Sequence, residues 1–133
     1  MIMRKKSLLV WSSLIFTLPL ALAAYFRIWL TAAALIAVII TSLLYHRSQG
    51  KKFQRLDALF ARLLIVSNLW ICYLGHFVFP YFAIVLALIL ADSYFYFREE
   101  RMNYPLGHSL WHLFSALITV FSILTFIKGS GLL

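Results

Sequence analysis

The sequence predicts an all-α fold, a polytopic transmembrane helical bundle of about five spans, in which residues 1–133 form a single integral membrane domain. Hydrophobic residues occupy 64% of the 133 positions and charged residues only 12%, against about 25% charged in soluble domains. The apolar runs are continuous, and each approaches the ~20 residues that a helix needs to cross the hydrocarbon core. No linker or internal repeat indicates a second domain.

Hydrophilic gaps and turn residues divide the chain into its spans. A basic segment at residues 47–52 follows the second apolar run. Gly75 and Pro80 mark a turn inside an apolar stretch that is too long for one crossing. Pro105 suits the first turn of the last helix. We therefore expect spans at residues 7–24, 28–46, 54–74, 77–97 and 106–127.

The N-terminus allows two interpretations. Its basic start, its apolar run and the small residues Ala21-Leu22-Ala23 are typical of a secretory signal peptide with a cleavage site. The apolar run is longer than a usual signal core, however. We therefore favour a retained first helix.

The distribution of basic residues predicts the orientation. Twelve Lys and Arg against four Asp and Glu give a formal net charge of +8, which in a soluble protein would raise the question of nucleic acid binding. Here the basic residues lie in short gaps between apolar runs, so the positive-inside rule explains them and no nucleic acid partner is expected. The rule places the N-terminus in the cytoplasm and the C-terminus outside, in a multi-pass protein of the plasma (inner) membrane.

Few ionisable side chains lie inside the expected spans, and each is a functional-site candidate because charge is costly to bury in lipid. A group of polar residues is expected at the cytoplasmic ends of spans two, three and five: Ser42, His46, Asp57, His108 and His112. Residues four apart share a helix face, so His108 and His112 project together. Ser42 and His46 are also four residues apart, so they are expected to share a face of the second span. An i, i+4 histidine pair is the arrangement that binds zinc in the His-Glu-x-x-His proteases.

These residue types predict a zinc site. One zinc ion (Zn2+) is expected on three imidazoles, those of His46, His108 and His112. Three protein ligands leave the fourth tetrahedral position for water, which is the open form typical of catalytic zinc, and water bound there is a nucleophile at neutral pH. Asp57 is the candidate general base, since it is an acid expected at the same depth. Ser42 could donate a hydrogen bond to the developing oxyanion.

The joint pattern is Ser-x-x-x-His, an Asp eleven residues after that His, and His-x-x-x-His at the start of the last span. It resembles the alkaline ceramidase branch of the CREST superfamily. The resemblance implies that the three histidines bind zinc, that the Asp acts on metal-bound water, and that the chain hydrolyses a membrane lipid amide or ester. Family members usually have seven spans, so two helices between the Asp and the histidine pair are missing here, and a partner protein or a second copy of the chain could supply them.

Alternatives from other classes stay open. The metal could clamp three helices in a non-catalytic protein, or the chain could be a small subunit of a membrane complex. Haem is a third candidate, but i, i+4 histidines on one helix cannot flank one iron from opposite faces. Asp92 could support a ligand imidazole, form an ion pair with Arg62, or cap the helix toward lipid. Arg62 could extend to the headgroups or bind an anionic substrate group.

Overall fold

The computed structural model describes residues 2–48, 50–98 and 104–132, and this part of the chain is an all-α bundle. It contains five spans that are long and apolar enough to cross a membrane. The first span comprises α1 (Ile2–Ser13), the 3₁₀ turn η1 (Leu14–Phe16) and α2 (Thr17–Tyr25). The other spans are single helices, namely α3 (Trp29–Ser48), α4 (Lys51–Leu74), α5 (Tyr81–Arg98) and α6 (Tyr104–Gly129). The predicted multi-pass membrane fold is confirmed.

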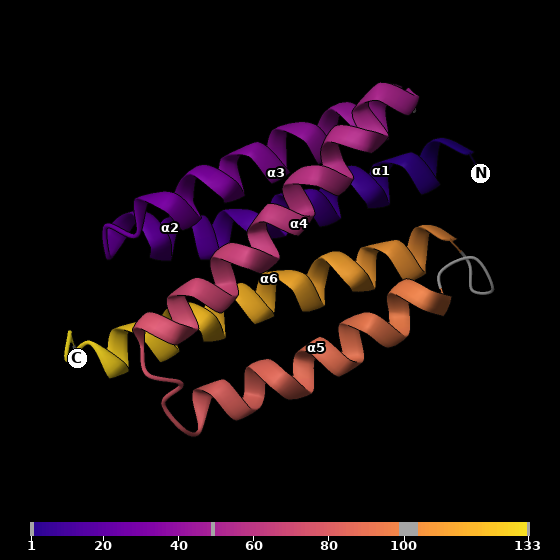
Figure 1. Cartoon of the computed structure of the whole chain (residues 1–133). Helices are drawn as coiled ribbons and strands as arrows, with labels where there is room; N and C mark the ends of the chain where they lie inside the picture. Colours follow the sequence, from indigo (N-terminus) through magenta and orange to yellow (C-terminus); the bar gives the residue numbers. More distant parts are fainter. Residues whose placement is uncertain (1, 49, 99–103, 133) are drawn as a thin grey trace.

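Helix α6 lies at the centre of the bundle (Figure 1). It packs against α5 on one side and against α4 and both halves of the first span on the other. Helix α3 packs against α4 and the first span. Helix α5 packs almost entirely against α6, so α4 and α5 diverge from the turn that joins them. This divergence matters for the site, because it leaves one flank of the bundle open.

The turn between α4 and α5 covers residues 75–80. His76 and Phe77 have positive φ angles of 54° and 52°, a left-handed conformation in which an α-helix cannot continue. Pro80 follows, and it has no N–H to donate to a helical hydrogen bond. Helix α5 therefore begins at Tyr81, later than residue 77, where the sequence places the start of the fourth span.

The first span changes from an α-helix to a short 3₁₀ helix and back between α1 and α2. The hydroxyls of Ser12 and Ser13 both donate to the carbonyl of Leu9, over 2.9 and 3.0 Å. Directly after them, Leu14–Phe16 forms a 3₁₀ turn, and Pro19 removes one helical N–H donor from the next turn. The two serines are thereby held on the side of the span that faces α3 and α6.

Helices α4 and α6 approach each other closely at the other end of the bundle. A Cβ added to Gly129 would collide with the backbone of Gly75, and one added to Gly75 would lie 2.5 Å from the carbonyl oxygen of Thr125. Small residues commonly permit such close helix packing in membranes. Only glycine fits at these two positions without moving a helix.

Candidate metal centre

Three histidines from two helices meet at one end of the bundle. His46 lies in the last turns of α3, and His108 and His112 lie in the first turns of α6. One ring nitrogen from each histidine can be chosen so that the three atoms lie within 4.8 Å of one another. The centroids of the three rings are 4.6 to 5.4 Å apart. All three side chains are buried, with exposed fractions of 3%, 6% and 1%. A cluster of this kind could hold a metal ion.

The chemistry of the donor set fits zinc, which binds neutral imidazole nitrogens. The Nε2 atom of His46 is buried and has no hydrogen-bond partner in the described part of the chain. An unpaired buried polar atom costs about 1–3 kcal/mol, and coordination would remove that cost. Zn–N bonds of about 2.0–2.1 Å in tetrahedral geometry hold ligand nitrogens ~3.3 Å apart, so the rings would move closer together on binding.

Ser12 of α1 orients the ring of His112. Its Oγ lies 2.9 Å from His112 Nδ1. Because the Ser12 hydroxyl already donates to the carbonyl of Leu9, the His112 ring N–H is the donor in this bond. The proton is thus on Nδ1, and the lone pair of Nε2 is free to bind a metal. Phe16 packs edge-on against the same ring, with centroids 5.6 Å apart.

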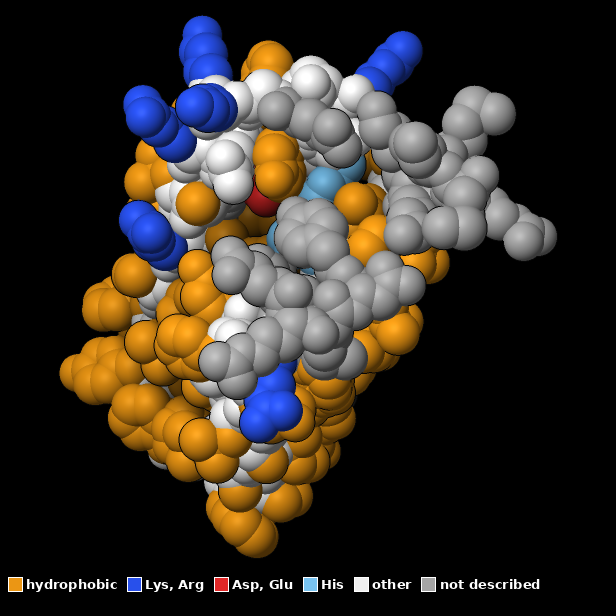
Figure 2. Space-filling view, turned by 90° about the vertical axis from the view of Figure 1, so that its right-hand side faces the viewer, with side chains coloured by type: hydrophobic (Ala, Val, Ile, Leu, Met, Phe, Trp, Pro, Cys, Tyr) orange, Lys and Arg blue, Asp and Glu red, His pale blue; other side chains and the backbone are white. Residues whose placement is uncertain are grey.

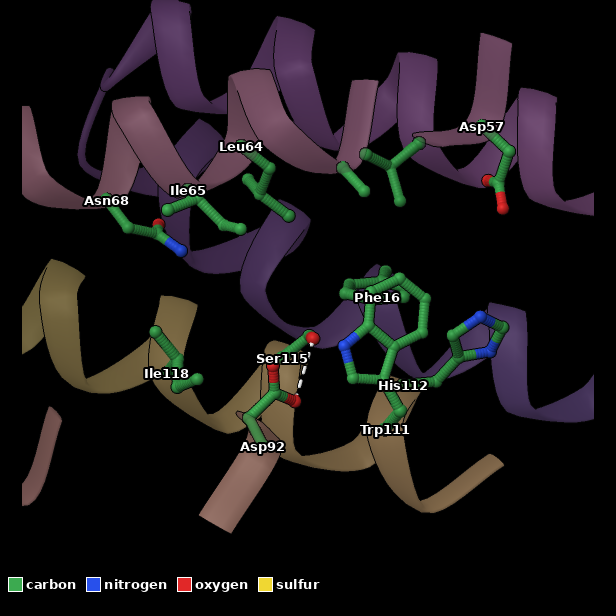
Figure 3. Close-up of a pocket in the computed structure, with 12 residues that line it drawn as sticks. Phe16, Asp57, Leu64, Ile65, Asn68, Asp92, Trp111, His112, Ser115 and Ile118 are labelled. Atoms are coloured by element: carbon green, nitrogen blue, oxygen red, sulfur yellow. Dashed lines mark hydrogen bonds between the residues drawn. The ribbon is translucent and has the colours of Figure 1, made fainter. Parts of the chain in front are cut away.

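Asp57 lies in the second turn of α4, close to the histidines. It is 7% exposed, and among the described residues its carboxylate has only a long hydrogen bond, 3.5 Å from Thr41 Oγ1. It lines one cavity with His108 and another with His112. Figure 3 shows Asp57 on α4 facing the side of α6 that carries His112. Its oxygens are therefore available to a group inside the cavities.

Ser42 is placed differently from the other predicted residues. It is fully buried one turn before His46, and its Oγ lies 2.9 Å from Ser13 Oγ. The Ser13 hydroxyl donates to the carbonyl of Leu9, so Ser42 is the donor to Ser13. Ser42 is not part of the lining of either cavity described below. To reach a substrate, its hydroxyl would have to rotate away from Ser13.

Two neighbouring cavities adjoin the histidines. The outer one, a groove of about 380 Å³, lies between α4 and α5 and reaches His108. The inner one has a volume of about 40 Å³ and reaches His112. Five residues line both cavities, namely Asp57, Ala61, Ile65, Asp92 and Trp111. In Figure 2, acidic and histidine side chains are visible inside a hollow at this end of the molecule, with Lys and Arg side chains around it.

The structure also places the two residues with several candidate roles. Asp92 of α5 accepts a hydrogen bond of 3.1 Å from Ser115 Oγ and interacts with the indole of Trp111. In the described part of the chain it forms no ion pair with Arg62. Arg62 is exposed and lines the outer groove. Asp92 forms part of the wall of both cavities.

Sequence reasoning missed Ser12 and Asn68, which belong to the surroundings of the site. Asn68 is 5% exposed and lines the inner cavity. A signal was present, since each is a polar residue inside an apolar span, where it must find a partner within the bundle. The partner could not be identified without knowing which helices are neighbours.

Comparisons of the chain with models of protein families, with curated proteins and with solved structures gave no match.

Proposed function

We propose that this chain is a zinc-dependent integral-membrane hydrolase of a lipid amide, similar to the alkaline ceramidase branch of the CREST superfamily. One observation carries the proposal. Three buried histidines lie within 4.8 Å of one another, beside the buried carboxylate of Asp57 and next to a groove on the flank of a membrane bundle. A purely structural polar cluster needs neither the groove nor the carboxylate.

The residues take distinct roles in this proposal. His46, His108 and His112 would hold the metal, which would supply an activated water molecule as the nucleophile at neutral pH. Asp57 accepts the proton of the attacking water on a carboxylate oxygen and returns it to the amide nitrogen as the C–N bond breaks. Ser42 donates a hydrogen bond to the oxygen on which negative charge develops.

The groove between α4 and α5 supports a lipid as the substrate. It is large enough for part of an acyl chain, and its lining combines the apolar residues Ala58, Ala61 and Ile65 with polar groups near His108. Its walls are two transmembrane helices that pack poorly on each other. A lipid could therefore enter from the bilayer without leaving it.

Charge supports a cytoplasmic position for the site. The last turn of α3 and the first turns of α4 lie at the histidine end of the bundle and carry a cluster of exposed basic residues, Arg47, Lys51, Lys52 and Arg55. By the positive-inside rule this end faces the cytoplasm. The proposal therefore places the N-terminus in the cytoplasm, the C-terminus outside, and the reaction near the cytoplasmic leaflet of the plasma membrane.

A structural metal site is the second candidate, and one feature favours it. Helices α3 and α6 share few close backbone contacts, yet the histidine cluster joins them directly. A metal held by His46 from α3 and by His108 and His112 from α6 would tie the two helices together. In this case the protein would need no substrate.

Two substitutions separate the candidates. His112→Ala removes a metal ligand and should abolish zinc binding. Asp57→Asn keeps the shape of the side chain but removes the base, so under the hydrolase proposal it should retain zinc and lose about 10²- to 10⁴-fold in turnover. The assay combines zinc stoichiometry with hydrolysis of fluorescent acyl-amide and acyl-ester lipids in detergent. Stoichiometric zinc without hydrolysis of any lipid, together with zinc loss in both variants, would support the structural candidate instead.

A further inference from the structure

An apolar groove runs between α3 and α4 in the half of the bundle that lies away from the histidines. It has a volume of about 440 Å³ and is lined by residues between positions 30 and 37 of α3 and between positions 60 and 70 of α4. These segments rise about 10 and 15 Å along their helices, close to half of the ~30 Å thickness of the hydrocarbon core. Trp29 and Trp70 are exposed at the end of the groove farther from the histidines, and tryptophan is typical of the membrane surface. The groove therefore extends from the membrane surface toward the middle of the bilayer, where α3 and α4 separate in Figure 1.

The lining of this groove fits a hydrocarbon chain. Its α3 wall is built largely from the small side chains of Ala33, Ala34 and Ala37. The one hydroxyl in the lining, that of Ser67, is already bonded to the hydroxyl of Thr31 over 2.7 Å. Because α3 and α4 pack on each other, a third helix about 10–12 Å in diameter would rest on the rim of the groove. A single acyl chain is thin enough to enter it.

A cation precedes the groove in the chain. Arg27 is exposed in the turn between α2 and α3, three residues before Leu30, which lines the groove. Its φ angle is 58°; its N–H bonds to the carbonyl of Ala24, and the N–H of Ile28 bonds to the carbonyl of Ala23. This is the Schellman ending of a helix, in which the left-handed position is usually glycine. Glycine would suit the backbone better here, so the side chain is the part of Arg27 that has a use.

The charges at this end of the bundle favour a phosphate group. The sequence has no acidic residue in the turn between α2 and α3, in residues 75–80 or in the last turns of α6, whereas Lys128 adds a second cation to Arg27. A guanidinium group binds two phosphate oxygens at once, and the phosphate of a lipid lies at the membrane surface next to its own acyl chains. An ammonium headgroup would find no carboxylate at this end. An anionic phospholipid is therefore a better match than a zwitterionic one.

We propose that Arg27 and the groove between α3 and α4 form a binding site for one anionic phospholipid, separate from the histidine cluster. The phosphate binds the guanidinium group of Arg27, and one acyl chain lies in the groove along Ala33 and Ala37. This site does not depend on the proposed hydrolase function. A second copy of the chain, covering the groove with one of its helices, is the competing occupant.

Trp70 lines the groove and can report on the lipid inside it. The test uses the full chain in phosphatidylcholine vesicles, with Trp70 as its single tryptophan and with Trp11, Trp29 and Trp111 replaced by phenylalanine. Quenching of Trp70 by phosphatidylglycerol with brominated acyl chains is compared with quenching by phosphatidylcholine with the same brominated chains. The ratio of the two gives the relative affinity of the lipids at the groove. It should favour phosphatidylglycerol about 5-fold, the factor expected from one cation near the membrane surface.

Two pairs of variants in this single-tryptophan chain assign the parts of the site. Arg27→Gln should bring the ratio close to one, whereas Lys128→Gln, the matched control at the same end, should leave it unchanged. Ala33→Phe fills the groove and should lower quenching by phosphatidylglycerol to the level of phosphatidylcholine; Ala87→Phe, on an exposed position of α5 outside the groove, should not. A ratio near one in the parent chain, a ratio that Arg27→Gln does not change, or an equal fall in Lys128→Gln would overturn the proposal. So would shielding of Trp70 from both lipids, which would assign the groove to a second copy of the chain.

Discussion

The bond from Ser12 to His112 gives a quantitative prediction for metal affinity. Ser12→Ala deletes the acceptor of the His112 Nδ1 proton, which lies 2.9 Å from Ser12 Oγ. His112 is 1% exposed, so water cannot replace the lost partner without rearrangement. An unsatisfied buried N–H costs about 1–3 kcal/mol, and partners that orient metal ligands are typically worth 10- to 100-fold in affinity. We expect Ser12→Ala to weaken zinc binding by about 10- to 100-fold, or ~1.4–2.7 kcal/mol.

The assay is a competition for zinc between the detergent-purified protein and a chromogenic chelator of known affinity. Ser109→Ala is the matched control, because its hydroxyl is bound to the carbonyl of Pro105 within α6. The control should bind zinc like the wild type. An unchanged affinity in Ser12→Ala, or an equal loss in both variants, would refute the assigned role of Ser12.

Three further predictions follow from the fold and the site. Gly129→Ala should lower the free energy of unfolding by about 1–3 kcal/mol, because the added Cβ meets the backbone of Gly75. Gly50→Ala is the control and should lower it less, because there is space for a Cβ at Gly50. A larger loss in Gly50→Ala would contradict this packing. Chelation of the metal should lower the melting temperature of the wild type but not of His46→Ala, and an equal shift in both would place the metal elsewhere. A topology reporter fused after Gly50 should report the cytoplasm and one after His76 the opposite side, and the same side for both would refute the five-span topology.

Local patterns in the sequence were sufficient for the spans and for the choice of histidines. The i, i+4 spacing of His108 and His112 determines a shared face on α6, and burial in lipid restricts charged residues to a few positions. The start of α5 was harder to predict. Phe77 is apolar like the helix that follows, and hydropathy does not reveal its positive φ.

Contacts between helices could not be predicted in the same way. The bonds of Ser12 to His112 and of Asn68 to Thr119 join residues 100 and 51 positions apart in the chain. They depend on which helices are neighbours and how they are rotated, and hydropathy carries no such information. For the same reason, the bond between Ser42 and Ser13 could not be predicted.

The central claim, that three histidines form a catalytic zinc site, is tested most directly by X-ray absorption at the zinc edge on protein purified with sufficient metal. We predict one zinc per chain, with three imidazole nitrogens at about 2.0–2.1 Å and one oxygen ligand from solvent. His46→Ala should lose this signature. Absence of zinc from the wild type would contradict the claim. So would a sulfur ligand at about 2.3 Å, which would implicate Cys72, the buried single cysteine of the chain on α4.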